Sequence, residues 1–352
     1  MGALGISKRL AILAVTSACW GSLALADHHP ARTKELYEAA RKEGLVVGYY
    51  GTLRTATEGP NGLISIFEKR FPGIKVRLVY GSGAQSREKI LAEAGAGRRI
   101  GDIMSGGENT IMDIFQEGVI AVYRSPEVRE DAVLVNPILS SPKEATPFRA
   151  LAYGITYNTE LVPKERIPYS WKDLLHPFWK DKLSMQDPGR GTGGGFSLFG
   201  ALWEKPGFGK EYWMALAKQN VFRQKGSGPL LQLVARGEHA ATLTDHSGNY
   251  WELKKGAAPV AFIKPKEGIH LSLIPMAVIK SAPHPNAAKL WVDWSISEEA
   301  QRIIAGAGYT PVRKGIKTSF PEASMEGVNV LQNPTATNVE LWLERVRSVF
   351  GN

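Results

Sequence analysis

The 352 residues exceed the usual size of a single hydrophobic core, so the length favours two lobes. Hydrophobic residues make up 43% of the chain and charged residues 22%, which is typical of soluble globular proteins. The basic residues behind the net charge of +9 are scattered in pairs, which argues against nucleic acid as a partner and supports a modest bias toward anionic ligands.

The first 26 residues have the pattern of a secretory signal peptide. Lys8 and Arg9 precede an apolar run that ends in small residues, so we expect cleavage after Ala26 and a periplasmic location. A membrane anchor is an alternative, but the apolar run is short for a membrane span. Lipidation of Cys19 is another alternative, which Thr16 disfavours. Because the chain has one cysteine, Cys19, the mature protein has none for a disulfide or a metal site.

The N-terminal third alternates between strands and helices. The periodicity predicts a helix over 33–44, strands over 45–50 and 74–81, helices over 61–73 and 82–97, a short strand over 101–107 and a helix over 108–118. Ser82 is placed to cap the helix that follows it. Repetition of strand, loop and helix is the pattern of a parallel sheet with right-handed crossovers.

The remaining elements are more varied. Residues 148–162 predict one long strand or two, and residues 169–188 a short helix, a loop and a strand. Helices are then predicted over 209–220, 228–237 and 250–256, and two helices within 284–308 with Asn286 and Ser297 as caps. Strands are predicted over 240–245, 259–268 and 271–282, and a final amphipathic helix over 333–350. The absence of a low-complexity linker indicates that ordered strands join the two lobes.

Loops at the carboxyl ends of the predicted N-terminal strands are the first candidate site. In open parallel sheets ligands bind at this edge, where each loop leads to the positive end of a helix. Exposed backbone N–H groups there can hold an anion or a polar head group. The loops supply six candidate ligand-binding residues: Thr52, Arg54, Ser82, Gly83, Glu108 and Asn109.

A glycine-rich stretch, residues 187–203, has the same order of strand, turn and helix. Its glycines let the backbone approach a ligand closely, and Arg190, Thr192 and Gly193 could contact one. The stretch is neither a P-loop nor a dinucleotide fingerprint. Taken alone it is more simply a turn, but four such loops in one chain favour a ligand site.

Three segments resemble the extracellular solute-binding proteins of ABC importers. They are "GITYNTELVP" from residue 154, "SWKDLLHPFWKDKLSMQDP" from residue 170 and "PMAVIKSAPHPNAAKLWVDW" from residue 275. The resemblance extends over nearly all of the mature chain and is to the group that includes ferric-ion, polyamine, thiamine and phosphonate binders.

The resemblance implies an α/β fold of type II, in which two hinge strands join two lobes around a ligand cleft. One lobe would comprise residues 27–150 and 266–352, with the tail helix on either lobe, and the other residues 151–265. The crossings would fall near 150–153 and 263–266. The implied partners are a small solute and a membrane permease; we expect a monomer, no cofactor and no catalytic residue.

Ferric-ion binders of this group use two adjacent tyrosines, whereas here Tyr250 is followed by Trp251. Tyr49 and Tyr50 are adjacent, but strand alternation sends their side chains to opposite faces. A ferric site would therefore use Tyr250, His246 and Glu108, a set with few anionic oxygen donors.

We rank a small anionic or polar organic solute above ferric ion. Phosphonates, phosphate esters and carboxylates suit Arg54 and Arg190. His246, Tyr250 and Trp251 would line the same cleft. A ligand-presenting partner of a membrane sensor would use the same cleft, so that alternative stays open. An exported hydrolase is disfavoured, because the chain has neither a His-Glu-x-x-His motif nor a Gly-x-Ser-x-Gly motif.

Overall fold

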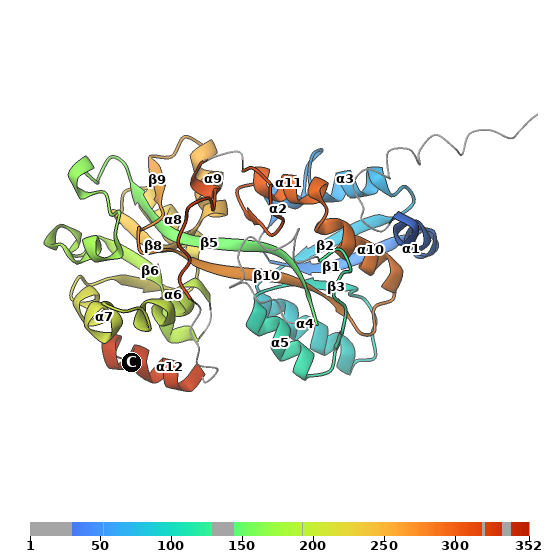
Figure 1. The fold of residues 1–352 in the computed structure, drawn as a ribbon. Coiled ribbons are helices and arrows are strands. Elements are labelled where there is room, and N and C mark those ends of the chain that lie inside the picture. Colours follow the sequence, from blue (N-terminus) through green and yellow to red (C-terminus); the bar gives the residue numbers. More distant parts are fainter. Residues whose placement is uncertain are drawn as a thin grey trace, which may run out of the picture.

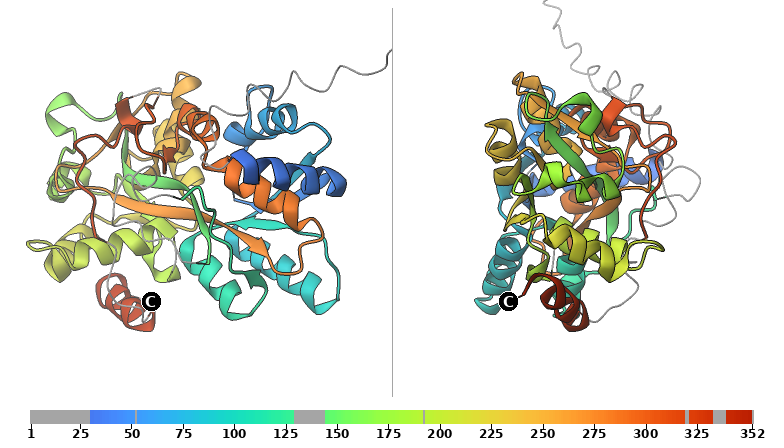
Figure 2. Two further views of the ribbon diagram at one scale, coloured as in Figure 1. Left: turned by 45° about the vertical axis from the view of Figure 1, so that its right-hand side comes forward. Right: turned by 90° about the vertical axis from the view of Figure 1, so that its left-hand side faces the viewer.

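The structure, a computed structural model, describes residues 30–51, 53–128, 144–191, 193–318, 321–332 and 339–351. The predicted signal peptide, Thr52 and Thr192 lie outside these ranges. The described elements form two lobes joined by two long strands, β5 (Thr146–Asn158) and β10 (His270–Ile279) (Figure 1). Turning the molecule shows the same two strands running from one lobe into the other (Figure 2).

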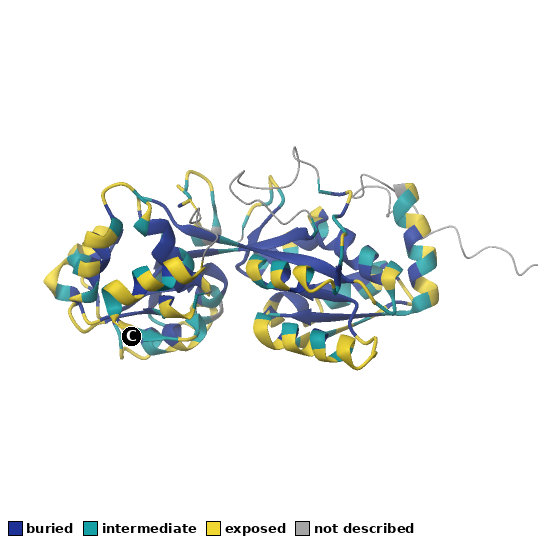
Figure 3. Cartoon of the chain, turned by 90° about the horizontal axis from the view of Figure 1, so that it is seen from below, coloured by how far each residue is buried: buried dark blue, intermediate teal, exposed yellow. Residues whose placement is uncertain are grey.

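Lobe 1 is built on the alternating pattern that the sequence predicts. Its short strands are β1 (Leu45–Tyr50), β2 (Lys75–Tyr80), β3 (Ile103–Ser105), β4 (Ile120–Ala121) and β11 (Thr310–Pro311). Its helices are α1 (Pro30–Glu43), α2 (Arg54–Thr57), α3 (Leu63–Arg70), α4 (Gly83–Gly95), α5 (Glu108–Gln116), α10 (Pro285–Ser295) and α11 (Glu298–Gly306). β1 pairs in parallel with β2 and β3, and β10 lies antiparallel between β3 and β5. The strands are largely buried and the helices expose their outer faces (Figure 3).

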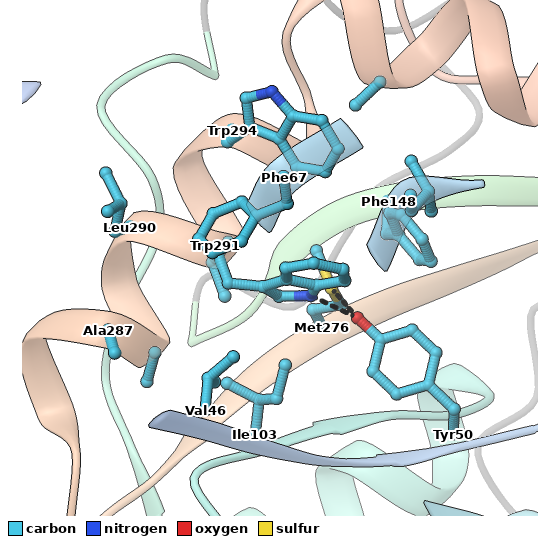
Figure 4. Close-up of a cluster of buried hydrophobic side chains, with 14 of the residues drawn as sticks. Val46, Tyr50, Phe67, Ile103, Phe148, Met276, Ala287, Leu290, Trp291 and Trp294 are labelled. Atoms are coloured by element: carbon cyan, nitrogen blue, oxygen red, sulfur yellow. Dashed lines mark hydrogen bonds between the residues drawn. The ribbon is translucent and has the colours of Figure 1, made fainter. Parts of the chain in front are cut away.

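Two hydrophobic cores cover the two faces of the sheet in lobe 1. Tyr50 belongs to the core under α3 and α10, where its hydroxyl accepts a hydrogen bond from Trp291 Nε1 at 2.7 Å (Figure 4). Phe67 packs edge-on against Trp291 in this core, with ring centroids 4.9 Å apart. Tyr49 belongs to the other core, with Met104 and residues of α4 and α5. The prediction that Tyr49 and Tyr50 point to opposite faces is confirmed.

Lobe 2 has mostly parallel strands flanked by helices. Its strands are β6 (Leu183–Gln186), β7 (Phe222–Gln224), β8 (Ala241–His246) and β9 (Val260–Ile263). Its helices are α6 (Gly193–Trp203), α7 (Gly209–Ala217), α8 (Ser227–Ala235) and α9 (Ser247–Lys255), with short 3-10 helices η1 (Lys164–Arg166), η2 (Trp171–Leu175), η3 (Pro177–Trp179) and η4 (Pro188–Arg190). β6 pairs in parallel with β7 and β8, whereas β9 is antiparallel to β5. Through β10 and β5 the described strands form one 11-stranded sheet that runs through both lobes. The predicted α/β class is confirmed.

The chain returns to lobe 2 after β11. The segment 321–332 contains η5 (Pro321–Ala323), and Ile269 exchanges backbone hydrogen bonds with Asn329 and Leu331. The last helix, α12 (Val339–Phe350), packs against α7 and η4 of lobe 2, where Trp342 is buried. The sequence places the second crossing near residues 263–266, whereas the joining strand β10 begins at His270.

Candidate functional site

One face of the hinge strands carries a row of polar and aromatic side chains. Strand alternation puts Arg149 and Tyr153 of β5 on the same face. Tyr153 is directly opposite His270 of β10 on one side and His246 of β8 on the other. Residues opposite each other in a sheet share a face, so the three side chains form a row across β10, β5 and β8.

Ring contacts extend this row to Tyr309, the residue before β11. The ring centroid of Tyr153 lies 5.8 Å from those of both His246 and His270. The ring of His246 lies 5.9 Å from that of Tyr309, and the guanidinium of Arg149 lies 4.7 Å above the same tyrosine ring. We call these five residues the hinge cluster. Because His246 belongs to lobe 2 and Tyr309 packs in the core of lobe 1, the cluster joins the two lobes.

Arg149 is a buried cation. Its exposed fraction is 4%, and its Nε and Nη1 have no hydrogen-bond partner. No ion pair joins it to a carboxylate within the described ranges. Burial lowers the pKa of its guanidinium, and the nearby Tyr309, Tyr153 and Tyr50 act in the opposite direction. Arginine remains protonated in proteins, so an unpaired charge lies here at a considerable desolvation cost that an anion would offset.

The histidines of the cluster are neutral at pH 7. Burial, followed by the charge of Arg149, lowers the pKa of His246 to about 3. Burial alone lowers the pKa of His270 to about 4. His246 Nδ1 accepts a hydrogen bond from the backbone N–H of Asn249 at 3.3 Å, which caps α9, so its proton resides on Nε2. Both ring nitrogens of His270 are buried without a partner.

Two helices of lobe 2 begin against the aromatic rings of the cluster, and glycine makes both approaches possible. A Cβ on Gly194 in α6 would lie 2.4 Å from Tyr153 Cε1, and one on Gly248 in α9 would lie 2.6 Å from Tyr309 Cε1. The N-terminus of a helix carries partial positive charge, so α6 and α9 add to the anion preference of Arg149.

The glycine-rich stretch is also a packing element. Gly191 has φ +68°, and a Cβ there would lie 3.0 Å from Val339 of α12. A Cβ on Gly195 would lie 2.1 Å from the carbonyl oxygen of Gln186. Gly191 and Gly195 are therefore required for close packing against α12 and β6, independently of any ligand of the loop.

The described lobe 1 candidates lie at helix starts. Ser82 caps α4 in a reciprocal pair with Gln85, which confirms the predicted cap, and Gly83 follows as the first helical residue. Glu108 begins α5, and burial raises the pKa of its carboxyl to about 7. Asn109 is exposed. Arg54 is exposed as well and pairs with Glu58 at 2.9 Å.

The lobe 2 candidates separate into two groups. His246 joins the hinge cluster, whereas Arg190 is exposed at the end of η4 and Gly193 is exposed as the first residue of α6. Tyr250 lies in a hydrophobic cluster of lobe 2, and its hydroxyl donates to Glu322 Oε1 at 3.0 Å. Trp251 is half-buried and packs against Gly308. The structure therefore brings His246, but not Tyr250, into the hinge cluster.

The ferric alternative can be compared with the described side chains. Tyr250 uses its hydroxyl in the bond to Glu322, while Glu108 belongs to lobe 1 and His246 to lobe 2. Within the described ranges, no group of three or more His, Cys, Asp or Glu side chains is arranged to hold a metal ion.

Sequence reasoning missed four members of the cluster, Arg149, Tyr153, His270 and Tyr309. The signal for the first two was present, because Arg149, Leu151 and Tyr153 alternate with alanines in "FRALAYG". That alternation predicts an arginine and a tyrosine on one face of a strand. The approach of Tyr309 and His270 depends on the topology and has no local signal.

Comparison with known proteins agrees with the fold. A family model for bacterial extracellular solute-binding proteins matches residues 31–302. An uncharacterised protein of Haemophilus influenzae is 29% identical over 197 residues, which cover 53% of this chain and 55% of that protein. A putative 2-aminoethylphosphonate-binding periplasmic protein of Salmonella paratyphi A is 24% identical over 276 residues, or 74% of this chain and 77% of that one. The chain thus spans about half the length of the first of these relatives.

Solved structures show the same fold. Iron-bound HitA from Pseudomonas aeruginosa superimposes with a TM-score of 0.67 at 20% identity, covering 87% of this chain and 99% of that one. AfuA from Actinobacillus pleuropneumoniae, with fructose-6-phosphate bound, gives a TM-score of 0.65 at 22% identity, covering 87% and 96%.

The chain belongs to the family of bacterial extracellular solute-binding proteins. The predicted family and the two-lobe type II fold are confirmed. This is a family of transport proteins, not of enzymes. Among the described helices, none is long and apolar enough to cross a bilayer.

Proposed function

We propose that this protein is the periplasmic solute-binding component of an ABC importer and that its solute is a small organic anion. The observation that carries the proposal is Arg149, a buried cation whose Nε and Nη1 have no partner at the junction of the two lobes. An anionic group on the solute would pair with this guanidinium and offset the cost of burying the charge.

The site would be completed by neutral donors. Burial raises the pKa of the Tyr153 hydroxyl, so this group stays protonated and can donate to the anion, as can His246 Nε2. The helix starts of α6 and α9 would supply backbone N–H groups. On this proposal Ser82, Gly83, Glu108 and Asn109 of lobe 1, with Arg190 and Gly193 of lobe 2, surround the solute farther from its charge.

Relatives support two chemical classes of solute. The Salmonella relative is named for an aminophosphonate, and AfuA was solved with a sugar phosphate. Both solutes carry an anionic group that suits an arginine. Iron-bound HitA shares the fold. In this protein the hydroxyl of Tyr250, the tyrosine proposed as a ferric ligand, is hydrogen-bonded to Glu322, so we rank ferric ion second.

The expected partners are the solute and a membrane permease. A monomer that closes over its solute would deliver it to a membrane permease, after removal of residues 1–26. Pull-down of the solute-loaded protein by its permease would support import, whereas capture by a sensor kinase would favour the signalling alternative.

A thermal-shift screen tests the solute class. Phosphonates, phosphate esters, carboxylates, amines and ferric citrate would each be added to the full protein. At one hundred times its dissociation constant, a bound solute stabilises the fold by about 2.7 kcal/mol. We expect anions to give this shift. Stabilisation by amines or ferric citrate alone would contradict the proposal.

Substitution of arginines locates the anion. Arg149→Met removes the buried charge, and we expect it to weaken anion binding by about 2 kcal/mol or more, as for a lost charge-assisted hydrogen bond. The exposed Arg98→Met is the matched control. Arg190→Ala decides whether the exposed arginine also contributes. If Arg149→Met binds anions with wild-type affinity, the assignment of Arg149 as the anion-binding residue is wrong.

A further inference from the structure

His270 is placed to meet the part of the solute that Arg149 does not hold. It lies directly opposite Tyr153, on the face of the hinge strands that carries Arg149. The imidazole is 2% exposed, and neither ring nitrogen has a hydrogen-bond partner. A buried polar group without a partner costs free energy, so a group that arrives with the solute would be favoured at this position.

The chemistry of this position differs from that of Arg149. A neutral imidazole has one N–H donor and one bare nitrogen acceptor. Burial lowers the pKa of His270 to about 4, so the ring is neutral at pH 7. An anionic oxygen pairs more strongly with the charged donors of Arg149 than with a neutral ring. The acceptor nitrogen of His270 then remains for a donor on the solute.

The surroundings of His270 offer little competition for that role. Tyr153 stacks on the ring, with centroids 5.8 Å apart and an angle of 25° between the planes. Ser272 follows on the same face of β10 and is half-buried. This stacking restricts the orientation of the imidazole plane.

We propose that His270 accepts a hydrogen bond from the solute and selects, among small organic anions, those that also carry a hydroxyl or amino group. This inference rests on the proposed function and narrows its ligand class to bifunctional solutes. Arg149 and Tyr153 are four residues apart on an extended strand, about 13 Å between Cα atoms.

Matched pairs of compounds test the selection without changing the charge. The pairs are 3-hydroxypropylphosphonate and propylphosphonate, glycerol 3-phosphate and propyl phosphate, and 4-hydroxybutyrate and butyrate. Their affinities for the full protein would be measured by titration calorimetry. We expect the hydroxylated member of at least one pair to bind about fivefold to tenfold more tightly, the effect of one hydrogen bond.

Variants of His270 assign the selection to this residue. His270→Leu should bring the affinity ratio close to one, whereas His270→Gln, which keeps an acceptor, should retain part of it. His176→Leu, at an exposed histidine of lobe 2, is the control and should keep the full ratio. A ratio within one variant is unaffected by a loss of overall stability.

The outcomes separate the two proposals. If anions bind but no pair shows a preference, or if His270→Leu keeps the wild-type ratio, the role of His270 is wrong and the proposed function stands. If no phosphonate, phosphate ester or carboxylate binds at all, the proposed function is wrong and the role of His270 with it.

Discussion

Asp245 has no exposed surface, and its carboxyl accepts hydrogen bonds from Thr156 Oγ1 at 2.8 Å and Asn249 Nδ2 at 3.2 Å. Burial raises the pKa of this carboxyl to about 7, although the hydrogen bonds act in the opposite direction. The folded state therefore binds a proton that the unfolded state has already lost above about pH 4. Its contribution to stability is complete below that pH and is lost as the pH rises through 7.

We expect Asp245→Asn to remove this dependence. Between pH 5 and pH 8, the free energy of unfolding of the wild type should fall relative to that of the variant, by at most about 1.4 kcal/mol per pH unit. Urea unfolding at several pH values measures the difference. The exposed Asp113→Asn is the control for loss of an acidic side chain. Parallel pH profiles of wild type and Asp245→Asn would contradict the assignment.

The two histidines of the hinge cluster have the opposite effect on the pH dependence of stability. Their pKa values in the folded state, about 3 for His246 and about 4 for His270, lie below the ordinary value of 6.5. Between these pH values the unfolded state binds more protons than the folded state, so stability falls as the pH drops below 6.5 toward 4.

Replacing one histidine should reduce this loss of stability at acidic pH. In His270→Leu, we expect the slope of unfolding free energy against pH between 4 and 6.5 to be smaller by the equivalent of about one proton. Thermal or urea unfolding across this range would show it. An unchanged slope would mean that the His270 imidazole is protonated in the folded protein.

The packing of a helix N-terminus against its neighbours can depend on a single glycine. A Cβ on Gly194 of α6 would overlap the ring of Tyr153 at 2.4 Å, whereas one on Gly228 of α8 would meet nothing within 4 Å. Neither glycine has a positive φ, so the difference between them is space alone. The two positions therefore form a natural pair for measuring the cost of the close approach.

Gly194→Ala should destabilise the protein by about 1–3 kcal/mol, because the helix must move away from the hinge strand. Gly228→Ala should be neutral or stabilising by up to about 1 kcal/mol, since alanine lowers the entropy of the unfolded chain. Urea unfolding of both variants provides the comparison. Equal effects would show that α6 can shift without cost.

Local pattern accounts for most elements and for only part of the site. Periodicity predicted β1, β2, α3 and α4, and the cap at Ser82 was confirmed. Periodicity did not predict α2, within the loop after β1, or the docking of α12 on η4, because that contact joins distant segments. Arg149 lies within the predicted strand over 148–162 but was not among the predicted site residues, since its role depends on Tyr309 and His246, which the fold brings to it.

At the scale of the whole molecule, the two faces of the hinge strands differ. The face opposite the cluster is apolar, with Ala150, Ala152 and Leu271 packed against Ile296 and Val312. The segment after β11 packs there too, through Val328 and Val330. The face with Arg149 carries polar groups that lack partners. We therefore expect the lobes to close over the Arg149 face when a solute binds.

Small-angle X-ray scattering tests this closure. Addition of a saturating anion identified by the thermal-shift screen should reduce the radius of gyration, since contacts from both lobes to the solute stabilise the closed state. Arg149→Met at the same solute concentration should contract less. An unchanged radius with saturated wild-type protein would contradict hinge closure.

The position of β10 between β3 and β5 has a consequence for biosynthesis. A nascent chain that has not yet reached residue 270 leaves the edges of β3 and β5 without their common neighbour. The core around Phe67 lacks Trp291 and Trp294 until α10 is made. Lobe 1 therefore cannot complete its fold during translation of its own N-terminal strands, and it stays incomplete until more than three quarters of the chain has been synthesised. For a protein predicted to carry a signal peptide, this delay favours export before lobe 1 has folded, since a secretion channel threads an unfolded chain.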